Sequence, residues 1–214
     1  MTDEKGYIQF ECVWDYVERV DYDGLTELIQ WRGILHDERL MGVDANGVGY
    51  GNLSERIDNT DTFVITSTQT GHIRDLDASH FAIVTDNDVR ANRIACSGAI
   101  RASSESLSHA ILYRADNRIG AVVHVHAGET WRRLLGKAPT TGSHAEAGTV
   151  AMANEVERLA ESIDLGKPTV LVMGGHTDGL LSFGRTISEA ASVILRACGR
   201  SVPKESASLP AYDG

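Results

Sequence analysis

Segment 120–126 reads GAVVHVH, an apolar run of the kind that builds a buried strand, and it ends in two histidines. Successive side chains of a strand point to opposite faces, so His124 and His126 share one face while Val123 and Val125 occupy the other. Two imidazoles on one face of a buried strand need partners there. The pattern leaves two interpretations, hydrogen-bonded core histidines or two ligands of one metal ion.

A third histidine favours the metal interpretation. A catalytic zinc site takes three nitrogen or oxygen ligands from the protein and keeps a fourth position open. His176 lies in the glycine-rich turn GGHTDG, residues 174–179, directly after the apolar run 169–173. The alternative for His176 is a turn with a spare histidine. We treat His124, His126 and His176 as candidate ligands of one ion.

Apolar spacing along the chain predicts strands and helices in alternation. We expect helices over 23–41, from 103 onward, and over 128–135, 148–164 and 187–198. We expect strands over 52–57, 62–66, 81–84, 120–126, 169–173 and 179–183. The glycine-rich segment 42–51 predicts a loop with unusual backbone angles or close ligand approach.

Neither an internal repeat nor a charge block marks a second domain in the chain. The alternation of strand pairs and helices predicts an α/β fold, with a mostly antiparallel central sheet covered by helices. We expect a single three-layer α/β/α domain over residues 1–200 and a C-terminal tail over 201–214.

Charge and cysteine usage narrow the class of protein. The net charge of −10 and the sequence pI of about 5.2 argue against a nucleic-acid-binding or anionic-membrane surface. The first residues do not resemble a secretory signal, and no apolar run approaches the roughly 18 residues that span a bilayer. Cys12, Cys96 and Cys198 show no CxxC spacing, which predicts reduced thiols in a cytoplasmic protein. We expect no nucleic-acid or membrane partner.

Ser103, Ser104 and Glu105 precede an apolar helical face. Serine is favoured at a helix N-cap, and an acid in the first turn complements the helix dipole. Backbone N–H groups at a helix start or a glycine turn also hold anions, with serine hydroxyls as further donors. The segment fits either a plain helix start or part of an anion site.

In their order along the chain, these pieces resemble the class II aldolase/adducin family, whose zinc enzymes handle phosphorylated sugars. The similarity runs from about residue 25 to residue 198. The segments that carry it are Gly51–Arg56 (GNLSER, the family's GN(x)S(x)R), Phe63–Gly71 (FVIT…G, its phosphate turn), Ser103–Asp116 (SSE…H…YRAD), Ile119–His126 (IGAVVHVH, its DVGAVVHTH), Val170–Gly184 around His176 (its strand–NHG–strand unit) and Ile187–Ala190 (its LEEA helix).

The resemblance implies a role for each matching residue. His124, His126 and His176 would bind Zn²⁺, and Glu105 would be the general acid/base near the open metal position. The substrate phosphate would lie against Asn52, Gly71, Ser103 and Ser104. The family assembles as tetramers in which a neighbouring subunit completes the site, and a rough alignment puts His144 in that role, with Glu146 close by.

Three departures from the family pattern bear on the substrate. The ligand turn reads Gly175-His176-Thr177 where the family has NHG. The phosphate turn, residues 66–71, lacks the family's proline and is two residues longer. Ala127 follows the second histidine in place of proline. All three leave the metal ligands intact, but they weaken the expectation that the substrate is phosphorylated.

The resemblance and the residue types together predict a zinc-dependent lyase that cleaves a ketose phosphate, or a related small sugar, by retro-aldol chemistry. A metal-stabilised enediolate would be the intermediate, and Glu105 would move the proton. Histidine ligands also accept other divalent metals. The alternatives are a 4-epimerase, dehydratase or decarboxylase on the same scaffold, or a non-catalytic adducin-like binding module. A structural zinc site is less consistent with three histidines, because structural sites are closed and rich in cysteine.

Overall fold

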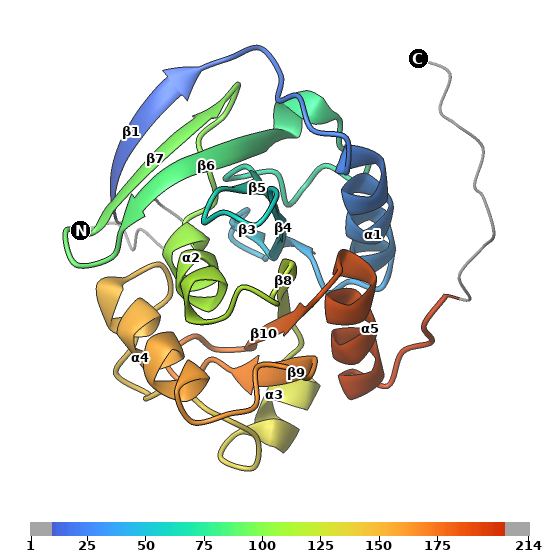
Figure 1. The fold of residues 1–214 in the computed structure, drawn as a ribbon. Coiled ribbons are helices and arrows are strands. Elements are labelled where there is room, and N and C mark those ends of the chain that lie inside the picture. Colours follow the sequence, from blue (N-terminus) through green and yellow to red (C-terminus); the bar gives the residue numbers. More distant parts are fainter. Residues whose placement is uncertain (1–9, 204–214) are drawn as a thin grey trace.

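The structure is a computed structural model that describes residues 10–203. Eight strands form one sheet in the order β1-β7-β6-β5-β4-β8-β10-β9, and β2 and β3 form a separate hairpin (Figure 1). The strands are β1 (Glu11–Tyr16), β2 (Gly42–Val43), β3 (Gly49–Tyr50), β4 (Asn52–Arg56), β5 (Phe63–Thr66), β6 (Phe81–Asp88), β7 (Arg93–Gly98), β8 (Ala121–His126), β9 (Thr169–Val172) and β10 (Gly179–Gly184). The helices are α1 (Leu25–Asp37), α2 (Ser106–Ala115), α3 (Gly128–Leu134), α4 (Val150–Ala160) and α5 (Ile187–Ala197), with a 3-10 turn at Ala78–His80.

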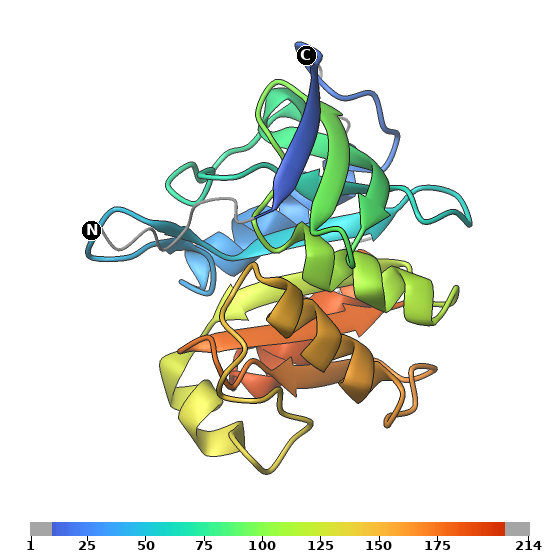
Figure 2. The same cartoon turned by 90° about the vertical axis from the view of Figure 1, so that its left-hand side faces the viewer.

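Helices cover both faces of the sheet. Figure 1 shows α2 and α4 on one side and α1 and α5 on the other, and Figure 2 turns the molecule so that α2 and α4 face the viewer. Within the large sheet every pair of neighbouring strands is antiparallel except β1 and β7, which run parallel. The predicted three-layer α/β/α domain with a mostly antiparallel central sheet is therefore confirmed.

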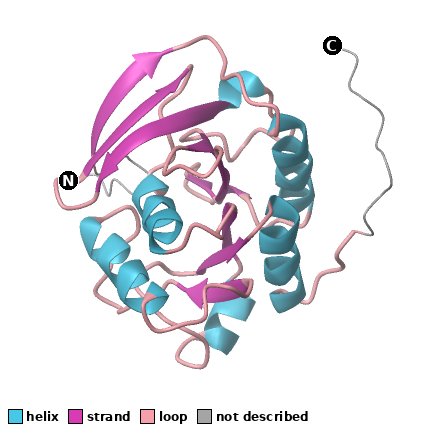
Figure 3. Cartoon of the chain, in the orientation of Figure 1, coloured by secondary structure: helices cyan, strands magenta, loops and turns pink. Residues whose placement is uncertain are grey.

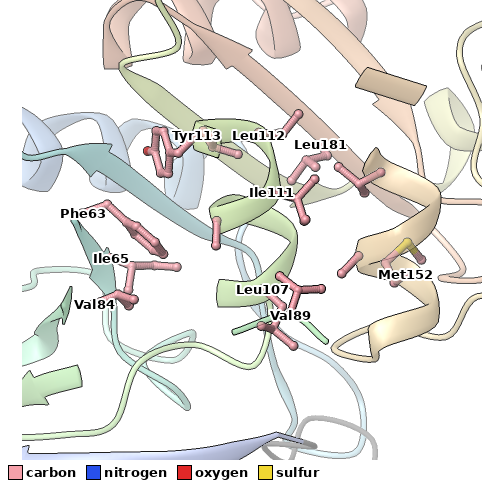
Figure 4. Packing of buried hydrophobic residues seen from close by; sticks show 14 of the residues in the cluster. Phe63, Ile65, Val84, Val89, Leu107, Ile111, Leu112, Tyr113, Met152 and Leu181 are labelled. Carbon is pink, nitrogen blue, oxygen red and sulfur yellow. The ribbon is translucent and has the colours of Figure 1, made fainter. Parts of the chain in front are cut away.

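Each face of the sheet carries its own apolar core. The first core lies against α2 and α4 and is shown in Figure 4; it includes Phe63, Ile65, Leu107, Ile111 and Met152. The second core lies against α1 and α5 and includes Leu28, Leu35, Val123, Val125 and Ile194. The period-two alternation of β8 explains this division, since alternate residues of one strand serve opposite faces.

Two strands of the large sheet were not predicted from the sequence. β1 and β7 carry mixed polar and apolar residues, ECVWDY and RIACSG, and form strands because β1 pairs with β7 and β7 pairs with β6. β1 is an edge strand and leaves Val13 and Tyr16 exposed. The segment 42–51, predicted as a loop, contains the short hairpin of β2 and β3. Its Gly47 and Gly51 have φ of 80°, which confirms the unusual backbone angles. Figure 3 shows the strands in magenta with helices in cyan on either side.

The helix predicted from Ser103 begins later, at Ser106. Glu105 occupies the N-cap position rather than the first turn, and its side chain does not cap the helix. The carbonyl of Ser103 accepts hydrogen bonds from the amide and the hydroxyl of Ser106, at 3.1 and 2.6 Å. A tight turn therefore precedes the helix, and Ser103 lies in that turn rather than at the N-cap position that the sequence suggested.

The three cysteines are free thiols. The Sγ atoms of Cys12 and Cys96 lie 3.6 Å apart across β1 and β7, well beyond the roughly 2.05 Å of a disulfide. Between residues 10 and 203, no helix combines the length and the apolarity needed to cross a membrane. The predicted tail, 201–214, lies outside the described residues from position 204 onward.

Candidate metal centre

His124, His126 and His176 bring their ring nitrogens together at the end of β8. The Nε2 atoms of His126 and His176 are 2.9 Å apart, and those of His176 and His124 are 3.3 Å apart. All three candidate ligand atoms lie within 4.8 Å of one another. The predicted alternation of β8 places the first two on one face, and the third arrives from the turn between β9 and β10.

Hydrogen bonds bring the His176 turn to the end of β8. Gly179, the first residue of β10, pairs with His126, and the amide of Ala127 donates to the carbonyl of Asp178 at 2.8 Å. At Gly175, where the family has asparagine, a Cβ would collide with the carbonyl oxygen of Ala145. The loss of that asparagine is therefore explained by close backbone packing, because no side chain fits at this position.

His124 is held in the tautomer that a metal requires. Its Nδ1 lies 3.0 Å from the carbonyl oxygen of Leu180, and a carbonyl only accepts, so the proton is on Nδ1. The lone pair of Nε2 consequently points toward the other two histidines. An imidazole whose second nitrogen donates to a carbonyl is the usual arrangement of a metal-binding histidine.

Burial keeps two of the imidazoles neutral. It lowers the pKa of His124 well below its ordinary value, and the neighbouring His176 and His126 lower it further. Burial and His176 also lower the pKa of His126 to about 3, against an opposing effect of Asp44. Neutral imidazoles are the form that binds metal ions.

The cluster fits a divalent cation. Nitrogen ligands about 2.0–2.1 Å from a tetrahedral zinc ion lie about 3.3 Å from one another. The separations of 2.9 and 3.3 Å between the Nε2 atom of His176 and those of His126 and His124 are close to this geometry. Within residues 10–203, no carboxylate or thiol joins the three histidines in this cluster. Three neutral protein ligands leave room for a substrate or water in the coordination sphere.

Tyr50 is a residue of the site that the sequence analysis missed. Its ring stacks on that of His126, with centroids 4.9 Å apart and planes 18° from parallel. It comes from β3, the second strand of the hairpin that lies in the glycine-rich segment. The only sequence signal was the aromatic residue between Gly49 and Gly51, which does not indicate a partner 76 positions away along the chain.

Tyr50→Ala is expected to weaken divalent-metal binding by roughly tenfold, because His126 loses the ring that fixes its orientation. Tyr50→Phe keeps the stacked ring and should bind metal like the parent chain. A competition titration against a chromophoric chelator measures both. Equal affinities for the parent and the alanine variant would show that the stacking does not orient the ligand.

Asn52 lies beside the histidine cluster, and its predicted contact with the substrate phosphate stays a prediction. It pairs with His124 across β4 and β8, so the two side chains share one face of the sheet. The side chain is buried, and its Oδ1 has no hydrogen-bond partner among the described residues. An unpaired buried acceptor is costly, and a substrate hydroxyl would satisfy it.

Glu105 is buried at the start of α2 and is 4% exposed. Burial raises the pKa of its carboxyl to about 7, against the opposing effects of hydrogen bonds from the Ser108 hydroxyl and the Gly148 amide. A carboxyl that titrates near neutrality suits a general acid/base. Its oxygens are not part of the histidine cluster, and its role as the general acid/base near the open metal position stays a prediction.

The other predicted site residues lie in different surroundings. Ser103 is buried, and its Oγ accepts from the amide of Glu105 at 3.4 Å, while Ser104 is partly exposed. Gly71 is buried against the β2–β3 hairpin, where a Cβ would lie 2.8 Å from the Cα of Gly49. His144 is exposed, beside Gly142 on the surface of this chain. Contacts of these residues with a substrate, or with a neighbouring subunit, stay predictions.

Comparisons with known proteins agree with this geometry. The family model of the class II aldolase and adducin N-terminal domain matches residues 39–197. A sequence comparison with curated proteins gives no match.

Among solved structures, an L-fuculose 1-phosphate aldolase is similar at 18% identity and a TM-score of 0.62, over 85% of this chain and 86% of that one. A sugar-phosphate aldolase from Thermotoga maritima gives 16% identity and a TM-score of 0.62, over 83% and 92%. An aldolase II superfamily protein from Pseudomonas syringae gives 20% identity and a TM-score of 0.57, over 81% and 72%. These likenesses confirm the fold, and the family model spans most of the sequence, including all three histidines. With its three-layer fold and its histidine cluster, the chain belongs to the class II aldolase and adducin N-terminal domain family.

Proposed function

We propose that the protein is a zinc-dependent lyase that cleaves a ketose phosphate, or a related small sugar, by retro-aldol chemistry. The observation that carries the proposal is the convergence of three imidazole nitrogens, from His124, His126 and His176, within 4.8 Å. Adducin-like binding modules have lost such ligands, so their presence here favours an enzyme. Zinc suits three histidines, although other divalent cations bind the same ligands.

The proposed chemistry divides between the cation and the chain. A divalent cation bound by the three histidines would act as a Lewis acid on the carbonyl and hydroxyl oxygens of the substrate. Asn52, with its unpaired buried Oδ1, would accept a hydrogen bond from the substrate and orient it beside His124. Glu105, a buried carboxyl with a pKa of about 7, would carry the proton that retro-aldol cleavage transfers.

A neighbouring subunit is part of the proposal. His144 is exposed and does not join the cluster of its own chain. In a homotetramer it would reach the site of the next subunit and accept the proton of the substrate hydroxyl whose oxygen becomes the departing aldehyde, while Glu105 returns a proton to the enediolate carbon. We also propose a cytoplasmic location, which the free cysteines support.

Metal analysis combined with a screen of ketose phosphates tests the proposal. The purified protein is expected to hold about one divalent ion per chain and to release dihydroxyacetone phosphate, or an aldehyde, from at least one ketose phosphate. An isomerised sugar, loss of water or release of carbon dioxide would identify an epimerase, dehydratase or decarboxylase instead. Metal-loaded protein that turns over none of these compounds would point to a binding module.

A further inference from the structure

Arg32 is a buried cation without an acidic partner. It lies on α1, is 1% exposed, and none of the described acidic residues forms an ion pair with it. One nitrogen, Nη1, has no hydrogen-bond partner in the described part of the chain. Burial lowers the pKa of the guanidinium to about 10, so it stays charged at neutral pH. A buried charge that is neither paired with an acid nor fully hydrogen-bonded is costly, and such a cost calls for a role.

The other terminal nitrogen of Arg32, Nη2, donates hydrogen bonds to three carbonyl oxygens of one turn. It donates to the carbonyl oxygens of Thr70 and Gly71, each at 3.2 Å, and of Ile73 at 2.9 Å. This is the turn that departs from the family pattern in length, and its Gln69 has a φ of 61°. Arg32 therefore supplies the internal partner that a longer turn with a left-handed residue needs.

These hydrogen bonds also set the direction of the backbone amides. In a trans peptide the C=O and the following N–H point in opposite directions, and no peptide bond among residues 10–203 is cis. Because the carbonyls of Thr70 and Gly71 point at Arg32, the amides of Gly71 and His72 point away from it. Neither amide meets a backbone acceptor within the described residues. Successive amides directed to one side form a recognised kind of anion site.

The turn adjoins the wall of the metal centre. Gly71 packs on Gly42 and Gly49, the residues that begin β2 and β3. The next residue of β3, Tyr50, stacks on His126. The hairpin of β2 and β3 therefore contacts the turn through Gly42 and Gly49 and the histidines through Tyr50, so a substrate at the histidines would lie near the turn. The neighbouring Arg74 differs from Arg32, since it is exposed and forms ion pairs with Asp37 and Asp75.

We propose that Arg32 is a positioning residue for the anionic group of the substrate, whose guanidinium holds the 70–73 carbonyls and so aims the Gly71 and His72 amides at a phosphate monoester. The inference rests on the proposed sugar-phosphate function and names the group that fixes its phosphate turn. It also explains how a chain with a net charge of −10 could bind an anion. The buried cation, which has no ion-pair partner, gives the turn a local positive potential.

Titration of the full-length protein with inorganic phosphate, followed by amide NMR, tests the proposal. In the parent chain, phosphate is expected to shift the amide signals of Gly71 and His72. Arg32→Met should weaken phosphate binding at least tenfold, and Arg32→Lys, which keeps the charge and three N–H donors but on a shorter side chain, should weaken it less. Arg74→Met is the matched control, because Arg74 is a neighbouring but exposed arginine, and it should bind phosphate like the parent.

Two outcomes would overturn the proposal: phosphate that shifts other amides in the parent chain, or unchanged phosphate affinity in folded Arg32→Lys and Arg32→Met. If Arg32→Met does not fold, the parent's amide shifts and the Arg32→Lys affinity decide the question.

In the active enzyme, Arg32→Lys should raise KM for a phosphorylated substrate and leave KM for the corresponding free sugar unchanged. A general loss of stability would not produce this difference between the two substrates. If phosphate binding depends on Arg32 but the protein cleaves no ketose phosphate, the proposed reaction is wrong and the phosphate site still stands. His124→Gln should likewise keep the phosphate shifts.

Discussion

His124→Gln is expected to remove the bound metal and to lower kcat/KM by about a thousandfold or more. The substitution keeps much of the side-chain volume but deletes the Nε2 lone pair that the Leu180 carbonyl holds in position. Two histidines alone do not make a three-ligand catalytic site. Lewis-acid stabilisation contributes several kcal/mol to such reactions, and each factor of ten in rate corresponds to about 1.4 kcal/mol.

Elemental analysis and steady-state kinetics on the same preparation measure both effects of His124→Gln. His80→Gln is the control, since His80 lies in the 3-10 turn Ala78–His80 and outside the histidine cluster; it should keep both metal and activity. A His124→Gln protein with full metal content and full turnover would end the metal-lyase proposal. Loss of metal with retained turnover would show that the reaction does not require the ion.

Glu105→Gln is expected to keep the metal and lose turnover by roughly a hundredfold to ten-thousandfold, the range that general acid–base catalysis contributes. The amide has nearly the same shape as the carboxyl, and the three histidines do not depend on it. What disappears is a group whose pKa, raised to about 7 by burial, lets it both donate and accept a proton near neutrality. The exposed Glu157 supplies the control, because Glu157→Gln on α4 should change neither property.

Glu105→Gln should also change how the free energy of unfolding depends on pH, in a direction that the raised pKa of Glu105 fixes. In the folded chain the pKa of Glu105 is raised from an ordinary value of 4.5 to about 7, so ionisation disfavours the folded state. The penalty is absent below about pH 4.5, grows as the pH rises to about 7 and is constant above that. A shift of this size corresponds to roughly 3 kcal/mol for a fully buried group.

Glu105→Gln should therefore match the metal-free parent in stability at about pH 4 and exceed it at about pH 8. Denaturant unfolding of both metal-free proteins at the two pH values measures the difference. Equal stabilities across this range would mean that Glu105 titrates in the folded chain as it does in the unfolded one. Turnover equal to that of the parent would remove Glu105 from the acid/base role, whatever its stability effect.

Local patterns in the sequence predicted a large part of the fold. The helices near 25–37, 150–160 and 187–197 follow from apolar spacing, and Thr186 caps the last of them by accepting from the amide of Glu189 at 3.2 Å. β8 follows from its alternation, which also placed His124 and His126 on one face. These features depend on neighbouring residues alone, and the sequence shows them directly.

The ligand set was predicted from the order of motifs, but its geometry depends on sheet pairing. His176 meets His126 because β10 pairs with β8 in the register that sets Gly179 against His126. A shift of one residue would turn the strand's side chains to the wrong face. No local pattern encodes that register, because it depends on how two segments 50 positions apart bury their apolar faces together.

The chain by itself determined which residues are available to bind a metal, move a proton and build a layered α/β domain. Only the tertiary structure decided that β1 would pair parallel to β7, that Tyr50 would stack on His126, and that Arg32 would be buried beneath the turn of Gly71. It also decided that Glu105 would lie where burial raises its pKa to about 7. Each of these depends on contacts between segments distant in sequence, and on the exclusion of water that follows when they pack.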